Sequence, residues 1–198
     1  MEVASELKLV EQPEKPMAMH PQKFALWLFM ISIVMLFAAL TSAYIVRKGD
    51  GNWRMFNLPD MFYYSTAIII FSSASLHWAY LAAKKDNFFQ LKLTLVVTFI
   101  LGLIFLVAQV FATADLVANN VYFTGGNPSE SFLYVLAGIH TLHLVSGLIF
   151  LAIVIYGAFK LNIHKKNMVR LSMCTTYWHF LGGLWIYLFV FLLLNHNY

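Results

Sequence analysis

Five apolar stretches, each long enough to cross a bilayer, restrict the fold of this chain more than any other feature. A hydrocarbon core about 30 Å thick is crossed by about 20 helical residues. The five stretches lie at about residues 24–46, 61–83, 91–113, 132–159 and 169–194. In lipid, every backbone polar group needs a partner within its own segment, so each stretch is predicted to be a helix. We therefore expect an all-α membrane protein, a bundle of five transmembrane helices.

The composition supports the same class. The chain has 61% hydrophobic and 11% charged residues, whereas soluble domains have about 25% charged residues. Its net charge of +4 does not indicate nucleic-acid binding, because the basic residues lie in short connections, where membrane topology places them. The one cysteine, Cys174, lies inside an apolar stretch. A single cysteine excludes an intramolecular disulfide and a cysteine metal cage.

The distribution of lysine and arginine predicts how the chain crosses the membrane. Residues 1–23 are expected to form a polar cytoplasmic tail, unlike a signal peptide, and residues 24–195 a single transmembrane domain. Most of the 13 basic residues lie in or beside this tail, the second connection or the fourth connection. The exceptions are Arg47, Lys48 and Arg54. By the positive-inside rule, the N-terminus is predicted inside and the C-terminus outside.

Small side chains indicate which helix faces pack together. The first stretch carries one stripe, at Ser32, Ala39 and Ala43. The second carries a longer one, at Ser65, Ser72, Ser75, Ala79 and Ala82. Because small residues let helices approach closely in lipid, both stripes are predicted to be packing seams.

The fourth and fifth stretches place three histidines and four glycines in apolar sequence. On helices, His140, His143 and Gly147 share one face, and His179 precedes Gly183 by one turn. Trp178 and Trp185 share another stripe, seven residues apart. A buried imidazole in lipid needs a hydrogen-bond partner, so these faces are predicted to point into the protein.

Haem or copper ligands are candidate roles for the membrane histidines His77, His140, His143 and His179, since imidazole is a common metal ligand. With a rise of about 1.5 Å per residue, His143 lies about 24 Å from the inner end of its helix and His179 about 13 Å. Those two do not match in depth. His77 and His179 are closer in depth, so a haem between them stays open as an alternative. The favoured interpretation is that the histidines hydrogen-bond neighbouring helices or a lipid headgroup.

The histidines belong to two motifs, GIHTLHLVSG in the fourth stretch and YWHFLGGLW in the fifth. These motifs resemble the signature of the cytochrome c oxidase subunit III family of the haem–copper respiratory oxidases. The matching residues are Gly138, His140, His143, Gly147, Tyr177, Trp178, His179, Phe180 and Trp185. Gln109, NPSESFLY and the opening stretch LWLFMISIVMLFAALTSAYIVRKG extend the resemblance to about residues 24–195.

The chain departs from this family pattern in three ways. The family's membrane glutamate falls on Ile33, and the aspartate of its second histidine motif falls on Gly182. The two N-terminal helices of the seven-helix form are missing, so the chain resembles the five-helix bacterial version. No role of either acid carries over to this chain.

The resemblance implies an accessory, non-catalytic subunit of a proton-pumping bacterial cytochrome c oxidase, which reduces oxygen to water in the inner membrane. It implies no catalytic, cofactor-binding or metal-binding residue in this chain, with haems and copper in partner subunits. The motif residues would pack helices or contact lipid, and Gln109 belongs with them. Expected partners are subunit I, by direct contact, subunit II, phospholipids and a possible respiratory supercomplex. The chain would stabilise subunit I and support proton uptake.

Two alternatives remain at this point. A quinol oxidase subunit III would have the same sequence features, because the electron donor docks on another subunit. An independent haem-binding or carrier membrane protein is the alternative from a different class.

Overall fold

The computed structural model describes residues 21–51, 53, 59–124, 127–160 and 168–196. Its helices are α1 (Pro21–Gly49), α2 (Met61–Lys84), α3 (Phe88–Ala118), α4 (Pro128–Phe159) and α5 (Val169–His196). All five are long and apolar enough to cross a membrane, and the described residues contain no strand. The predicted fold class, a five-helix membrane bundle, is confirmed. The predicted tail lies outside the described residues except for residues 21–23, which begin α1.

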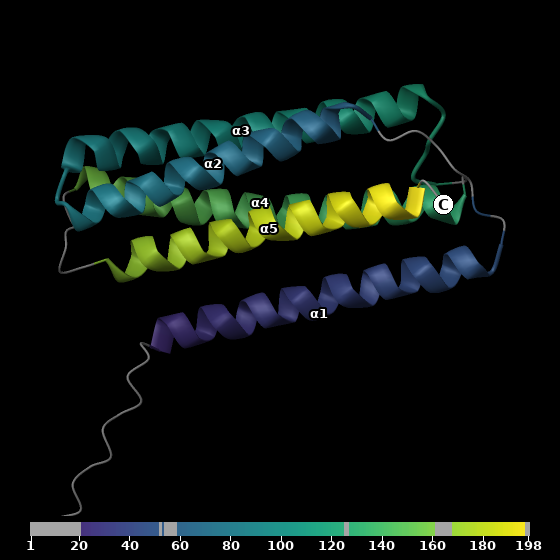
Figure 1. The fold of residues 1–198 in the computed structure, drawn as a ribbon, viewed down its shortest axis with the longest axis horizontal. Helices are drawn as coiled ribbons and strands as arrows, with labels where there is room; N and C mark the ends of the chain where they lie inside the picture. Colours follow the sequence, from purple (N-terminus) through teal and green to yellow (C-terminus); the bar gives the residue numbers. More distant parts are fainter. Residues whose placement is uncertain (1–20, 52, 54–58, 125–126, 161–167, 197–198) are drawn as a thin grey trace, which may run out of the picture.

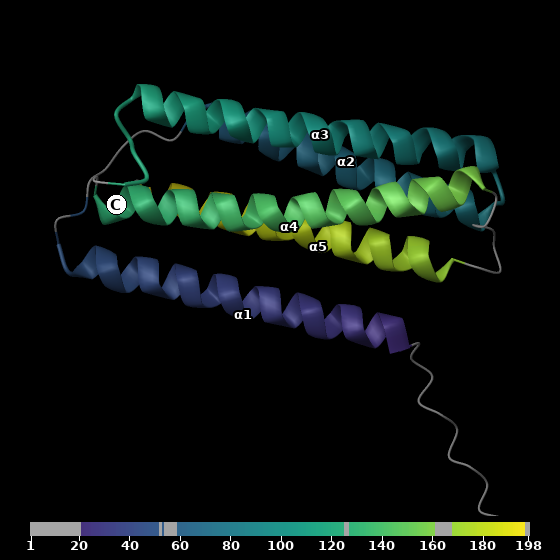
Figure 2. The same cartoon turned by 180° about the vertical axis from the view of Figure 1, so that it is seen from behind.

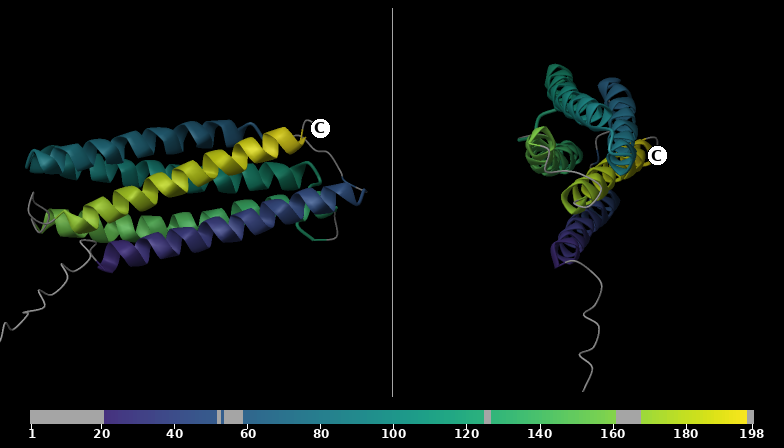
Figure 3. Two further views of the ribbon diagram at one scale, coloured as in Figure 1. Left: turned by 60° about the horizontal axis from the view of Figure 1, so that its bottom comes forward. Right: turned by 90° about the vertical axis from the view of Figure 1, so that its left-hand side faces the viewer.

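Helices α2 to α5 form a four-helix ring, and α1 lies outside it (Figure 1). Within the ring, α2 packs along α3, α3 against α4, α4 against α5, and α5 against α2. Helix α1 contacts only α4 and α5 in the described part of the chain. The view from behind in Figure 2 and the end-on view in Figure 3 show the same separation of α1 from α2 and α3.

Short polar connections set where the ring helices begin. The turn between α2 and α3 has Asp86 in the left-handed region, at φ 52°, which Asp tolerates better than most residues. The side chain of Asn87 then caps α3 by accepting the Gln90 N–H at 3.2 Å. Asn127 caps α4 in the same way, with Pro128 in the first turn.

The small-residue stripe of α2 is the seam of the α2–α3 hairpin. The buried members of this stripe are Ser65, Ser72, Ala79 and Ala82. Ser75 Oγ donates to the carbonyl of Thr94 in α3 at 3.1 Å. Gln109 Nε2 of α3 donates to Ser65 Oγ at 3.1 Å. Close approach and hydrogen bonds between helices therefore occur on the same face.

The prediction that small residues of α1 form a seam is wrong. Ser32, Ala39 and Ala43 are all exposed. The buried stripe of α1 instead consists of Met30, Ile33, Phe37, Thr41 and Tyr44. Mostly large side chains therefore make the contacts of α1 with α4 and α5, and α1 packs less closely there than the ring helices pack on one another.

The ends of α1 and α5 are tied together. Lys48 Nζ donates to the carbonyl of Asn195 at 2.6 Å, which places a cation at the C-terminal end of the α5 dipole. In the middle of the same interface, Thr41 Oγ1 lies 3.1 Å from Tyr187 Oη. These two contacts fix the lengthwise register of α1 on α5.

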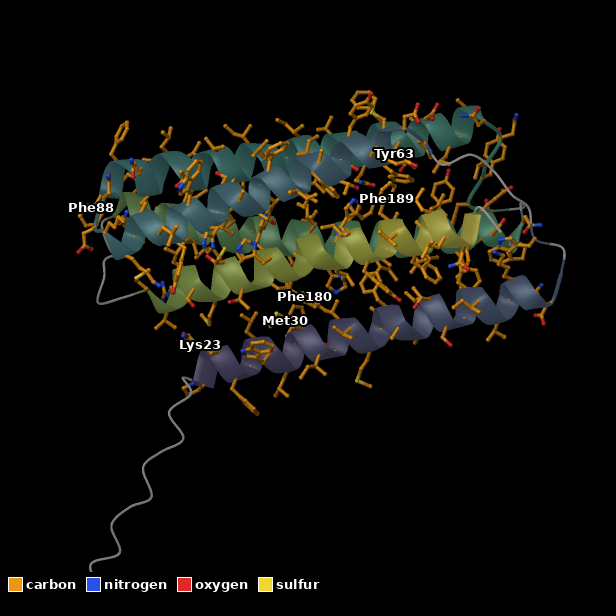
Figure 4. The ribbon with its side chains drawn as sticks, viewed as in Figure 1. Lys23, Met30, Tyr63, Phe88, Phe180 and Phe189 are labelled. Carbon is orange, nitrogen blue, oxygen red and sulfur yellow. The ribbon has the colours of Figure 1, made fainter. Side chains whose placement is uncertain are left out.

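Aromatic side chains fill the interior of the four-helix ring. Trp178 and Trp185 of α5 are almost fully buried there, and a methyl group added at Gly102 of α3 would lie 2.8 Å from the Trp178 ring. Gly102 is therefore the position that admits the indole. At the outer edge of the α2–α5 interface, Tyr63 and Phe189 meet edge to face, with ring centroids 4.9 Å apart (Figure 4).

Candidate functional site

His140 lies at the centre of the bundle and is completely buried. Aromatic rings of three other helices surround it. Ring centroids lie 6.4 Å away at Phe37 of α1, 6.3 Å at Phe105 of α3 and 5.2 Å at Trp185 of α5. Neither imidazole nitrogen has a hydrogen-bond partner among the described residues. The expected hydrogen bond from His140 to a neighbouring helix is thus absent from the described contacts, and ring packing surrounds the imidazole instead.

His143, one turn further along α4, lies at the α1 interface. Its Nδ1 lies 2.8 Å from the carbonyl oxygen of Ile139, so this hydrogen bond stays within α4. Its ring lies 6.4 Å from Phe29 and 6.0 Å from Phe37, both on α1. The expected hydrogen bond to a neighbouring helix is again replaced, here by a bond within α4 and ring packing on α1.

Tyr177 links three helices beside His143. Its hydroxyl lies 2.8 Å from Ser146 Oγ on α4, and its ring centroid lies 5.9 Å from that of Phe29 on α1. Because Tyr177 itself belongs to α5, it joins α1, α4 and α5 at one place.

The two tryptophans of α5 bond to α2. The Trp178 indole N–H donates to Ser72 Oγ at 3.1 Å, and the Trp185 N–H donates to Thr66 Oγ1 at 3.0 Å. The predicted tryptophan stripe thus points into the protein. Gly147 on α4 is also buried, and a methyl group added there would lie 2.9 Å from a Leu181 methyl.

Some motif residues lie elsewhere. Gly138 is exposed, with no neighbouring atom within 4 Å of an added methyl group. Phe180 is half-buried and lies between α5 and α1 (Figure 4). Gly183 is exposed and, with Phe180, lines a cavity of about 410 Å³ between these helices. The motif therefore marks both the packed interior and an open groove.

His179 faces His77 across the α2–α5 interface, with ring centroids 6.2 Å apart. The structure thus brings together the pair of histidines that matched in depth. His179 lines two cavities, the one beside α1 and a second of about 420 Å³ beside α2. Within the described residues, no group of three or more His, Cys, Asp or Glu side chains is placed to hold a metal ion.

The two positions where the family carries acids are both inward-facing. Ile33 is buried on the α1 stripe. Gly182 is also buried, and a methyl group added there would lie 3.1 Å from Ser73 Oγ of α2. Both positions therefore contact neighbouring helices rather than lipid.

Sequence reasoning missed three interior residues. Phe37 and Phe105 contact His140, and Gly102 makes room for Trp178. The phenylalanines gave no signal, because the chain has 18 of them spread over its apolar stretches. Gly102 did give a sequence signal, since it is a lone glycine inside a long apolar run.

These contacts define a multi-pass α-helical membrane protein whose buried motif residues join helices to one another. Residues 51–196 match the family described as Cytochrome c oxidase subunit III. The chain belongs to this family. Helix α1 precedes the matched residues.

Relatives of both oxidase types resemble the chain. It is 31% identical over 181 residues to the Cytochrome bo(3) ubiquinol oxidase subunit 3 of Buchnera aphidicola subsp. Schizaphis graminum, covering 87% of this chain and 93% of that protein. It is 30% identical over 175 residues to the protein of the same name from Pseudomonas aeruginosa, covering 84% and 81%. It is 26% identical over 168 residues to the Cytochrome c oxidase subunit 3 of Bacillus sp. (strain PS3), covering 82% and 80%.

Proposed function

We propose that this chain is the non-catalytic subunit III of a proton-pumping terminal oxidase in a bacterial inner membrane. Family membership makes it a subunit III of the haem–copper oxidases, associated with other oxidase subunits. In such a complex, oxygen reduction takes place on haems and copper in subunits I and II. One observation supports this division most strongly. The motif residues Tyr177, Trp178 and Trp185 hydrogen-bond to serines and a threonine on other helices, which is the work of a scaffold.

In this proposal the chain stabilises subunit I by direct contact, helps to sustain proton uptake and holds phospholipid against the complex. A phospholipid can contact the apolar surface beside the groove between α1 and α4. That groove, of about 640 Å³, is lined by Arg47, Asp50 and Phe132 among others. Arg47 pairs with Asp50 at 2.9 Å, and a guanidinium is well suited to a headgroup phosphate.

The electron donor has two candidates. The family resemblance put a cytochrome c oxidase first, although a quinol oxidase subunit III would have the same sequence features. The compared relatives favour a quinol oxidase, because the two at 31% and 30% identity carry the name ubiquinol oxidase, whereas the compared cytochrome c oxidase subunit is 26% identical. Parallel assays of reduced cytochrome c and of a quinol as substrates for the purified complex distinguish the two.

The proposal is tested by affinity purification through a tag on this chain from native membranes. We expect co-purification of subunits I and II with haem and copper, and oxygen consumption by the complex. Cells lacking the chain should assemble less oxidase, and the remaining oxidase should lose turnover faster. Isolation of the chain alone with one haem bound per chain would refute the accessory role.

The orientation is tested with single cysteines in a chain whose Cys174 has been replaced by alanine. A cysteine at Asn127 should react with an impermeant maleimide added outside intact cells. A cysteine at Asn162, in the last connection, should react only after permeabilisation. The reverse pattern would contradict the inside location of the N-terminus.

A further inference from the structure

A cavity of about 420 Å³ opens between α2 and α5, and its lining contains two imidazoles. The lining residues are Ser73, Ala74, His77, Trp78, Leu81 and His179. The two imidazole rings lie 6.2 Å apart between centroids, with their planes at 42°. His77 is exposed and His179 half-buried, so the pair can be reached from the surface of the bundle.

We propose that His77 and His179 bind a single monovalent copper ion, Cu(I), between α2 and α5. The separation of the two imidazole rings suits a shared ion. An imidazole nitrogen binds a metal at about 2.0 Å, so two rings in line with one ion have nitrogens about 4 Å apart and centroids about 6 Å apart. The observed centroid separation of 6.2 Å is the value expected for such a pair. Cu(I) accepts two ligands in line.

The charge of the site selects the metal. The cavity lining offers two imidazoles and a hydroxyl, with no carboxylate or thiolate to offset charge. The cost of placing an ion in a low-dielectric medium rises with the square of its charge, so a divalent ion is disfavoured much more than a monovalent one. Zinc also favours three or four protein ligands. Imidazole is a good ligand for copper, so Cu(I) fits both the ligand number and the charge.

The helix packing disfavours a haem at the same place. Gly182 lies three residues after His179 on α5, and a methyl group added there would lie 3.1 Å from Ser73 Oγ. The two helices therefore touch within one turn of the histidine pair, so a macrocycle would be blocked on that side. The site departs from the expectation that this chain holds no metal. Because the pair is accessible, we assign an exchangeable ion rather than a resident cofactor.

The test uses the full-length chain in nanodiscs under anaerobic conditions. His20, His164 and His196 are replaced by Asn in every variant, so that histidines near the chain ends and in the last connection do not compete. Cu(I) is titrated against a coloured Cu(I) chelator. We expect one ion per chain, with X-ray absorption showing two nitrogen ligands in line.

Two single variants and one control decide the ligands. His77→Leu and His179→Leu should each weaken Cu(I) binding by more than the about 10–100-fold that loss of a mere outer-shell partner costs. His143→Leu, which removes another membrane imidazole, should leave binding unchanged. Unchanged binding in His77→Leu, absence of binding by the parent chain, or equally tight binding of Zn²⁺ would each overturn the proposal.

A variant that gains binding keeps the test informative if the variants that lose binding fail to fold. Gly182→Asp combined with Ser73→Ala adds a carboxylate one turn from His179 and removes the hydroxyl that would crowd it. This third, anionic ligand should let the site bind Zn²⁺ at least about tenfold more tightly than the parent chain does, since divalent metals need charge compensation. His77→Leu in the same background should abolish the gain. An unchanged Zn²⁺ affinity would contradict the assigned geometry.

Discussion

Helices α1 and α2 each carry a stripe of small side chains at helical spacing, but only α2 buries its stripe. Ala79 of α2 has no exposed surface, whereas Ala43 of α1 is exposed. The serines of α2 have partners on other helices, such as the Trp178 indole that donates to Ser72 Oγ. Ser32 Oγ of α1 donates to a carbonyl of its own helix at 2.7 Å. A small-residue stripe becomes a seam where the facing helices supply matching groups.

The same difference separates a ring of close contacts from a loosely attached helix. Only 22% of the most apolar window of α1 is buried, against 50% for α5. The attachment of α1 depends on large side chains, of which Phe37 is the most buried. We expect substitutions in the ring to be costly and matched substitutions on α1 to be mild.

The largest contrast is expected between two tryptophans. Trp178→Ala empties a fully buried site and removes the bond to Ser72, so it should lower the free energy of unfolding by about 3–5 kcal/mol. Trp27→Ala, on a side chain that is 53% exposed on α1, should change it by no more than about 0.5 kcal/mol. Titration of the purified chains with SDS in mixed micelles measures both. Similar losses would show that α1 is as tightly packed as the ring.

The next contrast tests the two small-residue stripes directly. Ala79→Leu forces a larger side chain into the α2–α3 seam and should cost about 1–3 kcal/mol through overpacking. Ala43→Leu makes the same change on the exposed stripe of α1 and should have almost no effect. The unfolding midpoint in the same titration decides the comparison. A large loss from Ala43→Leu in the isolated chain would restore the α1 seam predicted from sequence.

A smaller change in the free energy of unfolding, of opposite sign, is expected at His140. Its imidazole contacts aromatic rings of α1 and of the ring helices α3 and α5. An unpaired buried polar group costs about 1–3 kcal/mol, so His140→Leu should raise the free energy of unfolding by up to about 1 kcal/mol after some loss of ring packing. The same substitution at His143, whose Nδ1 is bonded, serves as the matched comparison and should lower stability. A loss at His140 would mean that its imidazole has a hydrogen-bond partner.

The smallest effects concern single hydrogen bonds. Gln109→Leu removes a buried bond from α3 to Ser65, and Tyr187→Phe removes a partly exposed bond from α5 to Thr41. Bonds between membrane helices average about 0.6 kcal/mol and reach at most about 1.7 kcal/mol. Gln109→Leu should fall in the upper part of this range and Tyr187→Phe near its average. The opposite ranking would indicate that α1 depends on polar contacts more than on its large side chains.

Part of the site could be predicted because some patterns admit one solution. Trp178 and Trp185, seven residues apart, had to share a face, and the indole N–H groups needed buried acceptors. Depth along a helix follows from counting residues, which paired His77 with His179. The surroundings of His140 could not be predicted in this way, because they combine Phe37, Phe105 and Trp185 from three other helices.

The sequence by itself determined five membrane-spanning helices, their approximate limits and the oxidase subunit III family. The reason is that hydrocarbon permits a long apolar segment only one backbone structure, the helix. Only the tertiary structure decided which apolar side chains face inward and which of the two small-residue stripes is buried. In lipid an apolar side chain is equally well solvated facing inward or outward, so apolar periodicity carries little information and packing makes the choice. For that reason the α2 stripe became a seam, the α1 stripe stayed at the surface, and Gly102 became the position that admits Trp178.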